Sequence, residues 1–183
     1  MRERHVRGRR GGEEADALER AGVACEIVNG ITSGLAAASA AGVPLTHRDV
    51  AQGVVFVTAH AARRGKTDWT TLVRTRMTLV VYMGVARASA VEAALLAAGL
   101  AASTSVLVVE NATLPRERQL RTRVGRLARD IADHAISSPA IMVIGEVARA
   151  DSASDQSKNA NVLVSMLSRG GASGGVLGSS NAL

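Results

Sequence analysis

A charged triplet, His47, Arg48 and Asp49, follows a proline turn in the segment GVPLTHRDVAQ (42–52). An imidazole can exchange protons near neutral pH, while a guanidinium and a carboxylate hold fixed charges. Three such side chains on one loop favour contact with a ligand, because loops often carry binding residues. The alternative is structural, with Asp49 capping the next element and the other two side chains in solvent. The local pattern leaves both interpretations open.

The other residues that could do chemistry are dispersed along the chain. The four histidines have no local metal-ligand spacing, and the sequence contains no HExxH, EF-hand loop, Walker lysine motif or GxSxG. The single cysteine excludes an internal disulfide and a cysteine-based metal cluster. We therefore predict no metal site and a cytoplasmic location. The histidines are His5, His47, His60 and His134.

Composition narrows the class of protein. A chain of 183 residues with 47% hydrophobic content is the size of one domain, or of one domain with attached pieces, and can bury a sizeable core. The net charge of +6 suggests an anionic partner. Nucleic acid is the less favoured partner, because aromatic residues make up only 2% of the chain and cannot form a stacking platform. No apolar run approaches a membrane span or a signal peptide, so we predict no membrane association.

Strand-length apolar runs must position these residues. Four of them are rich in β-branched residues, as expected for strands covered on both faces. A further strand is predicted at ACEIV (24–28), and the segment QLRTRVGRL (119–127) is predicted to contain an edge strand with Arg121 and Arg123 directed outward. The four apolar runs are VVFV (54–57), LVVY (79–82), VLVV (106–109) and IMVI (141–144).

Helical patterns alternate with the strands, which predicts an α/β sheet domain. Ser89 and Glu92 have capping-box spacing, so a helix is expected from there to about Ala98, ended by Gly99. The small-residue segment 31–42 predicts a helix capped by Thr32 or Ser33. Two more helices are expected at 13–20 and 125–134, and the Ser/Gly-rich segment 151–183 is expected to be a flexible tail.

A series of loop motifs has an order and spacing that are more specific than any one motif. The motifs are GRRGGEEADAL, NGITSGLAAASAAGVPLTHRD, FVTAH, YMGV, VENATLP and VIGEV. Together they closely resemble the uroporphyrinogen-III C-methyltransferases of the tetrapyrrole methylase family, from about Arg10 to Arg149. The resemblance implies that residues 31–150 form the C-terminal α/β domain of that fold. Residues 10–30 would then be the last helix and strand of the N-terminal domain, behind a basic leader at 1–9 that does not resemble the family.

The same resemblance implies an activity. The family uses S-adenosyl-L-methionine to methylate uroporphyrinogen III twice, giving precorrin-2 for siroheme or cobalamin, and its members are homodimers. The acceptor carries acetate and propionate groups on every pyrrole, and an arginine fork binds a carboxylate bidentately. This would explain the cation in THRD.

Individual residues inherit expected roles from the matching motifs. By resemblance, Arg10 and Glu13 are the candidates for catalysis at the acceptor. His47 is expected to be structural, holding its loop so that Arg48 points correctly. Gly84 beside Met83 would let the backbone approach a ligand closely. The expected substrate-binding residues are Arg48, His60 and Met83, and the expected donor-binding residues are Thr32, Ser33, Met83 and Ala112.

The family's initial strand, its VGAGPGD-type glycine loop and its GGDP loop have no counterpart upstream of Arg10. We therefore expect a C-terminal portion of the enzyme with little activity alone. Two other classes stay open. One is a non-catalytic remnant that folds or dimerises, and the other is a basic nucleic-acid-binding module.

Overall fold

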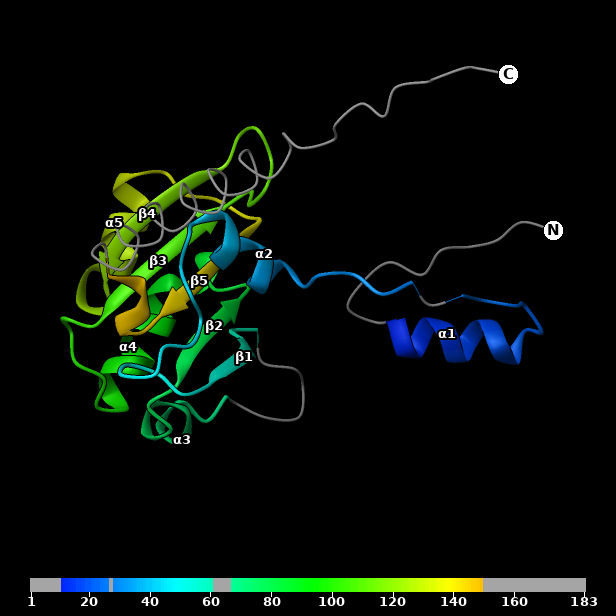
Figure 1. Ribbon diagram of the computed structural model, residues 1–183, viewed down its shortest axis with the longest axis horizontal. Coiled ribbons are helices and arrows are strands. Elements are labelled where there is room, and N and C mark those ends of the chain that lie inside the picture. The colour runs from blue at the N-terminus through cyan, green and yellow to red at the C-terminus, as the bar shows by residue number, and fades with distance from the viewer. Residues whose placement is uncertain (1–10, 27, 61–66, 150–183) are drawn as a thin grey trace, which may run out of the picture. The chain divides into compact units, whose positions relative to one another are not determined.

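The computed structural model describes residues 11–26, 28–60 and 67–149, which divide at Thr32 and Ser33 into two compact units (Figure 1). In the first unit, α1 (Gly11–Arg20) is followed closely by Gly22, whose φ of +66° lets the Val23 N–H donate to the Leu18 carbonyl. This confirms the helix predicted at 13–20. The strand predicted at 24–28 is wrong, because residues 24–26 and 28 have no regular structure. A strand requires a hydrogen-bonded neighbour, which a run of apolar residues cannot supply by itself.

The second unit is built on a five-stranded mixed sheet with the order β1-β2-β5-β3-β4. β1 is parallel to β2, while β5 is antiparallel to both β2 and β3, and β4 is antiparallel to β3. β1, β2 and β3 therefore point the same way. We call the edge where they end the carboxyl edge and the opposite one the amino edge. The strands are β1 (Val54–Thr58), β2 (Thr78–Tyr82), β3 (Ser105–Glu110), β4 (Arg118–Arg123) and β5 (Ala140–Ile144).

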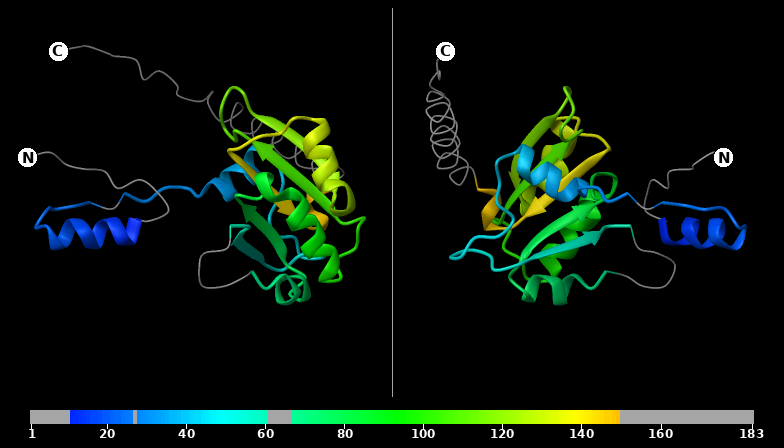
Figure 2. Two further views of the ribbon diagram at one scale, coloured as in Figure 1. Left: turned by 180° about the vertical axis from the view of Figure 1, so that it is seen from behind. Right: turned by 45° about the vertical axis from the view of Figure 1, so that its right-hand side comes forward.

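Helices cover both faces of this sheet, as the apolar runs predict (Figure 2). One face packs against α3 (Trp69–Arg74), α4 (Ala88–Ala97) and α5 (Leu127–Asp133), and the other packs against α2 (Ser33–Ala40). Side chains alternate between the two cores, with Leu79 and Val81 on the first face and Val80 on the second. Short 3₁₀ turns lie at η1 (Val85–Arg87), η2 (Val124–Arg126) and η3 (Glu146–Ala148).

β4 is an edge strand, as predicted, but its arginines differ in exposure. Arg123 is exposed, whereas Arg121 is half-buried and its Nη1 donates to the Ala148 carbonyl at 2.9 Å. The leader at 1–9, Arg10 and the tail at 151–183 lie outside the described residues.

The predicted capping box at Ser89 and Glu92 does not form. The turn η1 leads directly into α4, so Ser89 is the second helical residue, and Arg87 precedes the helix without a side-chain cap. The Glu92 carboxylate instead accepts from the Ala128 N–H at 2.8 Å, in the first turn of α5. The helix-capping group is real, but the helix that it caps lies 36 positions further along the chain.

Glu92→Ala should therefore destabilise the second unit by about 1 kcal/mol, the typical cost of losing an N-terminal cap. Ser89→Ala is the matched control and should change the free energy of unfolding by less than about 0.5 kcal/mol, as expected for an exposed site with no cap to lose. Urea unfolding of both variants measures the difference. If both variants lost the same free energy of unfolding, the predicted capping box between Ser89 and Glu92 would be favoured instead.

Candidate functional site

Three loops meet at the carboxyl edge, each directly after a strand. β1 is followed by Ala59 and His60, β2 by Met83, and β3 by Asn111 and Ala112. Because the three strands run in one direction, these loops lie at one end of the sheet, where open α/β sheets bind ligands. The structure therefore brings three of the predicted site residues, His60, Met83 and Ala112, to the same edge.

Two of these loops contain backbone conformations that residues other than glycine rarely adopt. Met83 has a φ of +54°, and Asn111 and Thr113 have φ values of +50° and +67°. Each non-glycine residue in this region costs about 1–3 kcal/mol, and such residues gather where ligands are held. Asparagine tolerates this conformation, whereas methionine has no such preference. No feature of the sequence indicated this conformation at Met83.

Gly84 has a different role from the predicted one. A Cβ at this position would lie 2.7 Å from the Sδ atom of Met142, a fully buried side chain of β5. The missing side chain therefore makes room for the core rather than for a ligand. The case for Met83 as a site residue is carried instead by its own backbone conformation and its place on the carboxyl edge.

The start of α2 is fixed at the same edge by Tyr82, the last residue of β2. The Gly34 N–H donates to the Tyr82 hydroxyl at 3.0 Å, and Ser33 is the exposed first residue of the helix. Tyr82 and Ala112 both pack against the buried cluster on the α2 face. Ser33, Met83 and Ala112, three of the four predicted donor-binding residues, thus share one edge of the sheet. The fourth, Thr32, is the exposed last residue of the first unit.

The segment THRD forms a closed turn that precedes β1. His47 and Ala51 exchange backbone hydrogen bonds of 2.8 and 2.9 Å, and the Asp49 N–H donates to the His47 Nδ1 atom at 3.3 Å. His47 and Asp49 are therefore turn-forming residues in this structure. Arg48 projects from the turn as an exposed side chain, without a hydrogen bond or ion pair to any described residue.

The structure does not bring Arg48 and His60 together. Arg48 precedes β1, and His60 follows it as an exposed residue whose N–H donates to the Thr58 hydroxyl. Five strand residues span about 16 Å. The two predicted substrate-binding residues thus lie beyond opposite ends of β1. Glu13 lies in α1, and its side chain is outside the described part of the chain, as is all of Arg10.

Glu110 is a buried carboxylate that stabilises the carboxyl edge through its contacts. This residue ends β3 and is 4% exposed, and its carboxylate accepts from both the N–H and the hydroxyl of Ser137 and forms an ion pair with Arg118 at 3.2 Å. The Asn111 N–H donates to the Pro139 carbonyl in the same region. The hydrogen bond from the Ser137 hydroxyl, opposed by burial, holds the pKa of Glu110 below its ordinary value.

This lowered pKa predicts a pH dependence of folding. A carboxylate with a lower pKa in the folded state contributes stability above its unfolded pKa, and the contribution is lost as pH falls through the folded pKa. The free energy of unfolding should therefore decrease as pH falls below about 4.3, the ordinary pKa of glutamate, because the unfolded chain then takes up a proton more readily than the folded one. Ser137→Ala removes the largest cause of the shift, so its unfolding should depend less on pH over this range. Urea unfolding between pH 7 and pH 3 makes the comparison, and parallel curves for the two proteins would contradict it.

The basic segment 116–129 contributes ion pairs on the surface. Arg126 lies 3.2 Å from Asp130 and Arg129 lies 3.4 Å from Asp133, and both arginines are exposed. Within the described residues, no three acidic, cysteine or histidine side chains are arranged to hold a metal ion. Of the helices described here, none has the length and apolar character needed to cross a membrane.

The sheet, the strained loops at its carboxyl edge and the order of the motifs agree with one class of protein. The chain belongs to the tetrapyrrole (corrin/porphyrin) methylase family, whose sequence profile matches residues 8–128. It is 52% identical over 140 residues to the uroporphyrinogen-III C-methyltransferase of Pseudomonas aeruginosa, covering 76% of this chain and 57% of that protein. It is also 45% identical over 139 residues to a siroheme synthase of Zymomonas mobilis, covering 75% of this chain and 29% of that protein.

Solved structures show the same fold. A uroporphyrin-III C-methyltransferase from Thermus thermophilus, complexed with S-adenosyl homocysteine, matches with a TM-score of 0.66 and 38% identity, covering 76% of this chain and 58% of that one. A cobalt precorrin-4 methyltransferase matches with a TM-score of 0.69 and 31% identity, covering 75% and 59%. The chain thus spans somewhat more than half the length of the C-methyltransferases that it matches.

Proposed function

We propose that this chain serves the S-adenosylmethionine-dependent C-methylation of uroporphyrinogen III to precorrin-2, for siroheme or cobalamin synthesis. The observation that carries the proposal is the carboxyl edge, where the start of α2, Met83 and Ala112 come together with strained backbone after β2 and β3. The relatives named uroporphyrinogen-III C-methyltransferase and the neighbour bound to S-adenosyl homocysteine support it.

The residues of this edge fit a donor held largely by backbone groups. Ser33 and Thr32 offer hydroxyls and amides around the start of α2, Met83 has a left-handed backbone conformation directly after β2, and Ala112 is a small residue directly after β3. When bound, the sulfonium donor supplies a methyl group attached to a good leaving group. The chain's residues need mainly to align the acceptor carbon with that methyl group and to exclude water.

The acceptor would be recognised through its carboxylates. Arg48 is an exposed guanidinium on a hydrogen-bonded turn, and His60 and Met83 lie at the donor's edge of the sheet. Because uroporphyrinogen III carries carboxylates around its whole rim, residues beyond opposite ends of β1 would bind different parts of one acceptor. Arg10 and Glu13 remain the proposed catalytic residues. We further propose a cytoplasmic homodimer that binds neither nucleic acid nor membranes.

A chimera tests this proposal directly. In the Pseudomonas aeruginosa relative, the 140 aligned residues would be replaced by those of this chain, giving a protein of the relative's full length. We expect the chimera to bind S-adenosylhomocysteine in calorimetry and to convert uroporphyrinogen III to precorrin-2. A folded chimera that binds neither the donor product nor the acceptor would favour the non-catalytic remnant. Binding of both without turnover would restrict the proposal to ligand binding.

A further inference from the structure

The loop after β3 carries Ala112 between two residues with left-handed backbone. Asn111 has a φ of +50° and Thr113 has a φ of +67°. Asparagine tolerates this region, but a β-branched residue such as threonine is a genuine outlier there. The Leu114 N–H donates to the Asn111 carbonyl at 3.0 Å, which closes a turn with Thr113 in third place. Turns with a positive φ in third place normally have glycine or asparagine at that position. Contacts from outside the turn are therefore needed to hold Thr113 in this conformation.

Glu117 supplies such a contact from the segment that leads into β4. The Thr113 N–H donates to its Oε2 atom at 2.7 Å, a short distance that is typical of a charged acceptor. The Glu117 side chain is half-buried, and its Oε1 atom accepts from the Gln119 Nε2 atom at 2.7 Å. Its own N–H donates to the Leu114 carbonyl at 2.9 Å. The carboxylate is thus fixed on both sides before it meets the Thr113 amide.

The first half of the same loop is anchored to the sheet. The Asn111 N–H donates to the Pro139 carbonyl at 2.9 Å, and Ala112 packs half-buried against the apolar cluster on the α2 face. The sheet therefore holds the loop up to Ala112, and the Glu117 carboxylate holds it from Thr113 onward.

We propose that Glu117 is a positioning residue for the methyl donor. Its carboxylate keeps Thr113 in left-handed backbone, and this fixes the backbone groups of Ala112 at the carboxyl edge before the donor arrives. A ligand binds more weakly when only a fraction of the molecules has its site formed, so a pre-formed loop raises the donor affinity. Glu117 acts through the loop and not by contact with the ligand. The inference rests on the proposed function, in which Ala112 binds the donor.

The chimera that carries this chain's residues gives the main test. Glu117→Ala should raise the dissociation constant for S-adenosylhomocysteine about tenfold, as expected if the loop is then formed in about one molecule in ten. At saturating donor, kcat/KM for uroporphyrinogen III should stay within about twofold. Glu117→Gln keeps an oxygen that accepts from the Thr113 N–H and should recover most of the donor affinity. A merely structural residue would lower the melting temperature and leave the donor affinity unchanged. Unchanged affinity in Glu117→Ala, or an equal loss in Glu117→Gln, would overturn the proposal.

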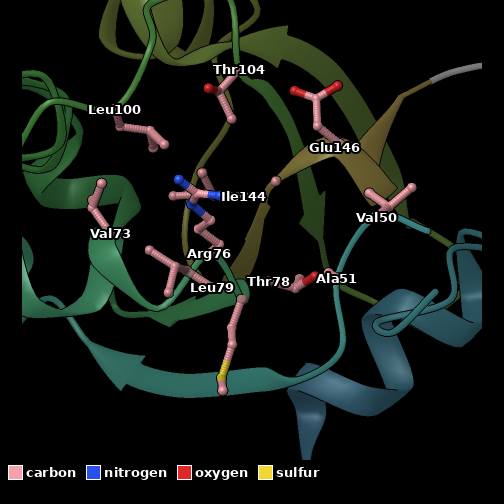
Figure 3. A pocket seen from close by; sticks show the side chains of 12 residues that line it. Val50, Ala51, Val73, Arg76, Thr78, Leu79, Leu100, Thr104, Ile144 and Glu146 are labelled. Atoms are coloured by element: carbon pink, nitrogen blue, oxygen red, sulfur yellow. The ribbon is translucent and has the colours of Figure 1, made fainter. Parts of the chain in front are cut away.

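Glu146 offers a matched control. It is an exposed carboxylate that follows β5 at the amino edge and lies 3.7 Å from Arg149. Figure 3 shows it beside a pocket that is lined by the start of β2 and the end of β5. Glu146→Ala removes the same charge at the opposite edge from the proposed donor site, so the dissociation constant for S-adenosylhomocysteine should stay within about twofold. A loss as large as that of Glu117→Ala would show that donor binding follows net charge, against a positioning role.

Thr113→Gly separates the backbone conformation from the contact that holds it. Glycine adopts a positive φ without strain. In a Thr113→Gly background, Glu117→Ala should therefore weaken S-adenosylhomocysteine binding by no more than about threefold, and a double-mutant cycle measures this coupling. If the loss were about tenfold in both backgrounds, Glu117 would not act through the Thr113 backbone and the proposal would fail.

The loop can also be tested without any donor. In the full chain, amide hydrogen exchange at Thr113 should be about tenfold faster in Glu117→Ala than in the parent or in Glu117→Gln, because a hydrogen bond to a charged group is lost. Unchanged exchange would overturn the inference even if the chimera methylates uroporphyrinogen III. If the exchange changes as expected but the parent chimera binds no S-adenosylhomocysteine, the proposed function fails, and with it the role toward the donor. Glu117 would then hold the loop and nothing more.

Discussion

Gly34→Ala should destabilise the second unit by about 2–3 kcal/mol through overpacking, even though alanine is normally the better helix former by about 1 kcal/mol. A Cβ at Gly34 would lie 2.5 Å from the Tyr82 hydroxyl oxygen, 2.8 Å from Val80 Cγ1 and 2.9 Å from Phe56 Cε1. Val80 is fully buried in the middle of the sheet and cannot give way. α2 must therefore move off the sheet, which also breaks the hydrogen bond from Gly34 to Tyr82.

Urea unfolding of the variant checks this sign. Ser39→Ala, an exposed position of the same helix, is the control and should be neutral or slightly stabilising. Tyr82→Phe removes the atom in closest conflict, so combining it with Gly34→Ala should recover part of the loss as a coupling energy of about 1 kcal/mol. If Gly34→Ala were as stable as the parent protein, helix propensity would outweigh contact with the sheet, and the start of α2 would not be held at the carboxyl edge.

The strands were the most predictable part of the fold. Runs such as Leu79–Tyr82 are predominantly apolar, with β-branched valines at their centre, because they are covered on both faces, and each lies within one observed strand. The order of the strands could not be read in the same way. β5 is inserted antiparallel between β2 and β3, and no local pattern in Ala140–Ile144 says which strands it will join. Pairing is decided by contacts that are distant in sequence.

The capping of α5 illustrates the same limit at the scale of one side chain. Ser89 and Glu92 have the spacing of a capping box, and the spacing alone cannot reveal that a 3₁₀ turn moves the start of α4 ahead of Ser89. Once the start has moved, Glu92 lies too far along the helix to cap it and is free to reach Ala128. A motif read along the chain identified a capping residue and missed its partner.

The candidate site was predictable in its positions and not in its conformations. Motif order indicated His60, Met83 and Ala112, and the parallel strands explain why these lie at one edge. The positive φ of Met83 and the Met142 side chain that fills the space beside Gly84 are tertiary features without a sequence signature. The separation of Arg48 from His60 follows from β1 lying between them, so THRD and FVTAH act beyond opposite ends of one strand.

Arg48 gives the second large expected effect, measured in the chimera that carries this chain's residues. Arg48→Ala should lower kcat/KM for uroporphyrinogen III by roughly 10- to 150-fold, equivalent to the 1.5–3 kcal/mol of a hydrogen bond to a charged group. The dissociation constant for S-adenosylhomocysteine should stay within about twofold, because Arg48 lies at the amino end of β1 and the proposed donor site lies at the carboxyl edge. Arg48→Lys should recover only part of the loss, since a point charge replaces a planar fork.

The controls for this experiment have opposite expected biases. Thr32→Val should weaken the binding of S-adenosylhomocysteine and leave kcat/KM for uroporphyrinogen III nearly unchanged. Arg74→Ala, which removes an exposed arginine outside the proposed site, should change neither quantity. His47 and Asp49 already close the THRD turn through the His47 Nδ1 atom and the backbone bonds to Ala51, so removing the Arg48 side chain leaves the turn in place. A lost contact, not a collapsed loop, is then the cause of any change in acceptor kinetics. If Arg48→Ala leaves those kinetics intact in an active chimera, THRD is a structural turn and the acceptor's carboxylates are bound elsewhere.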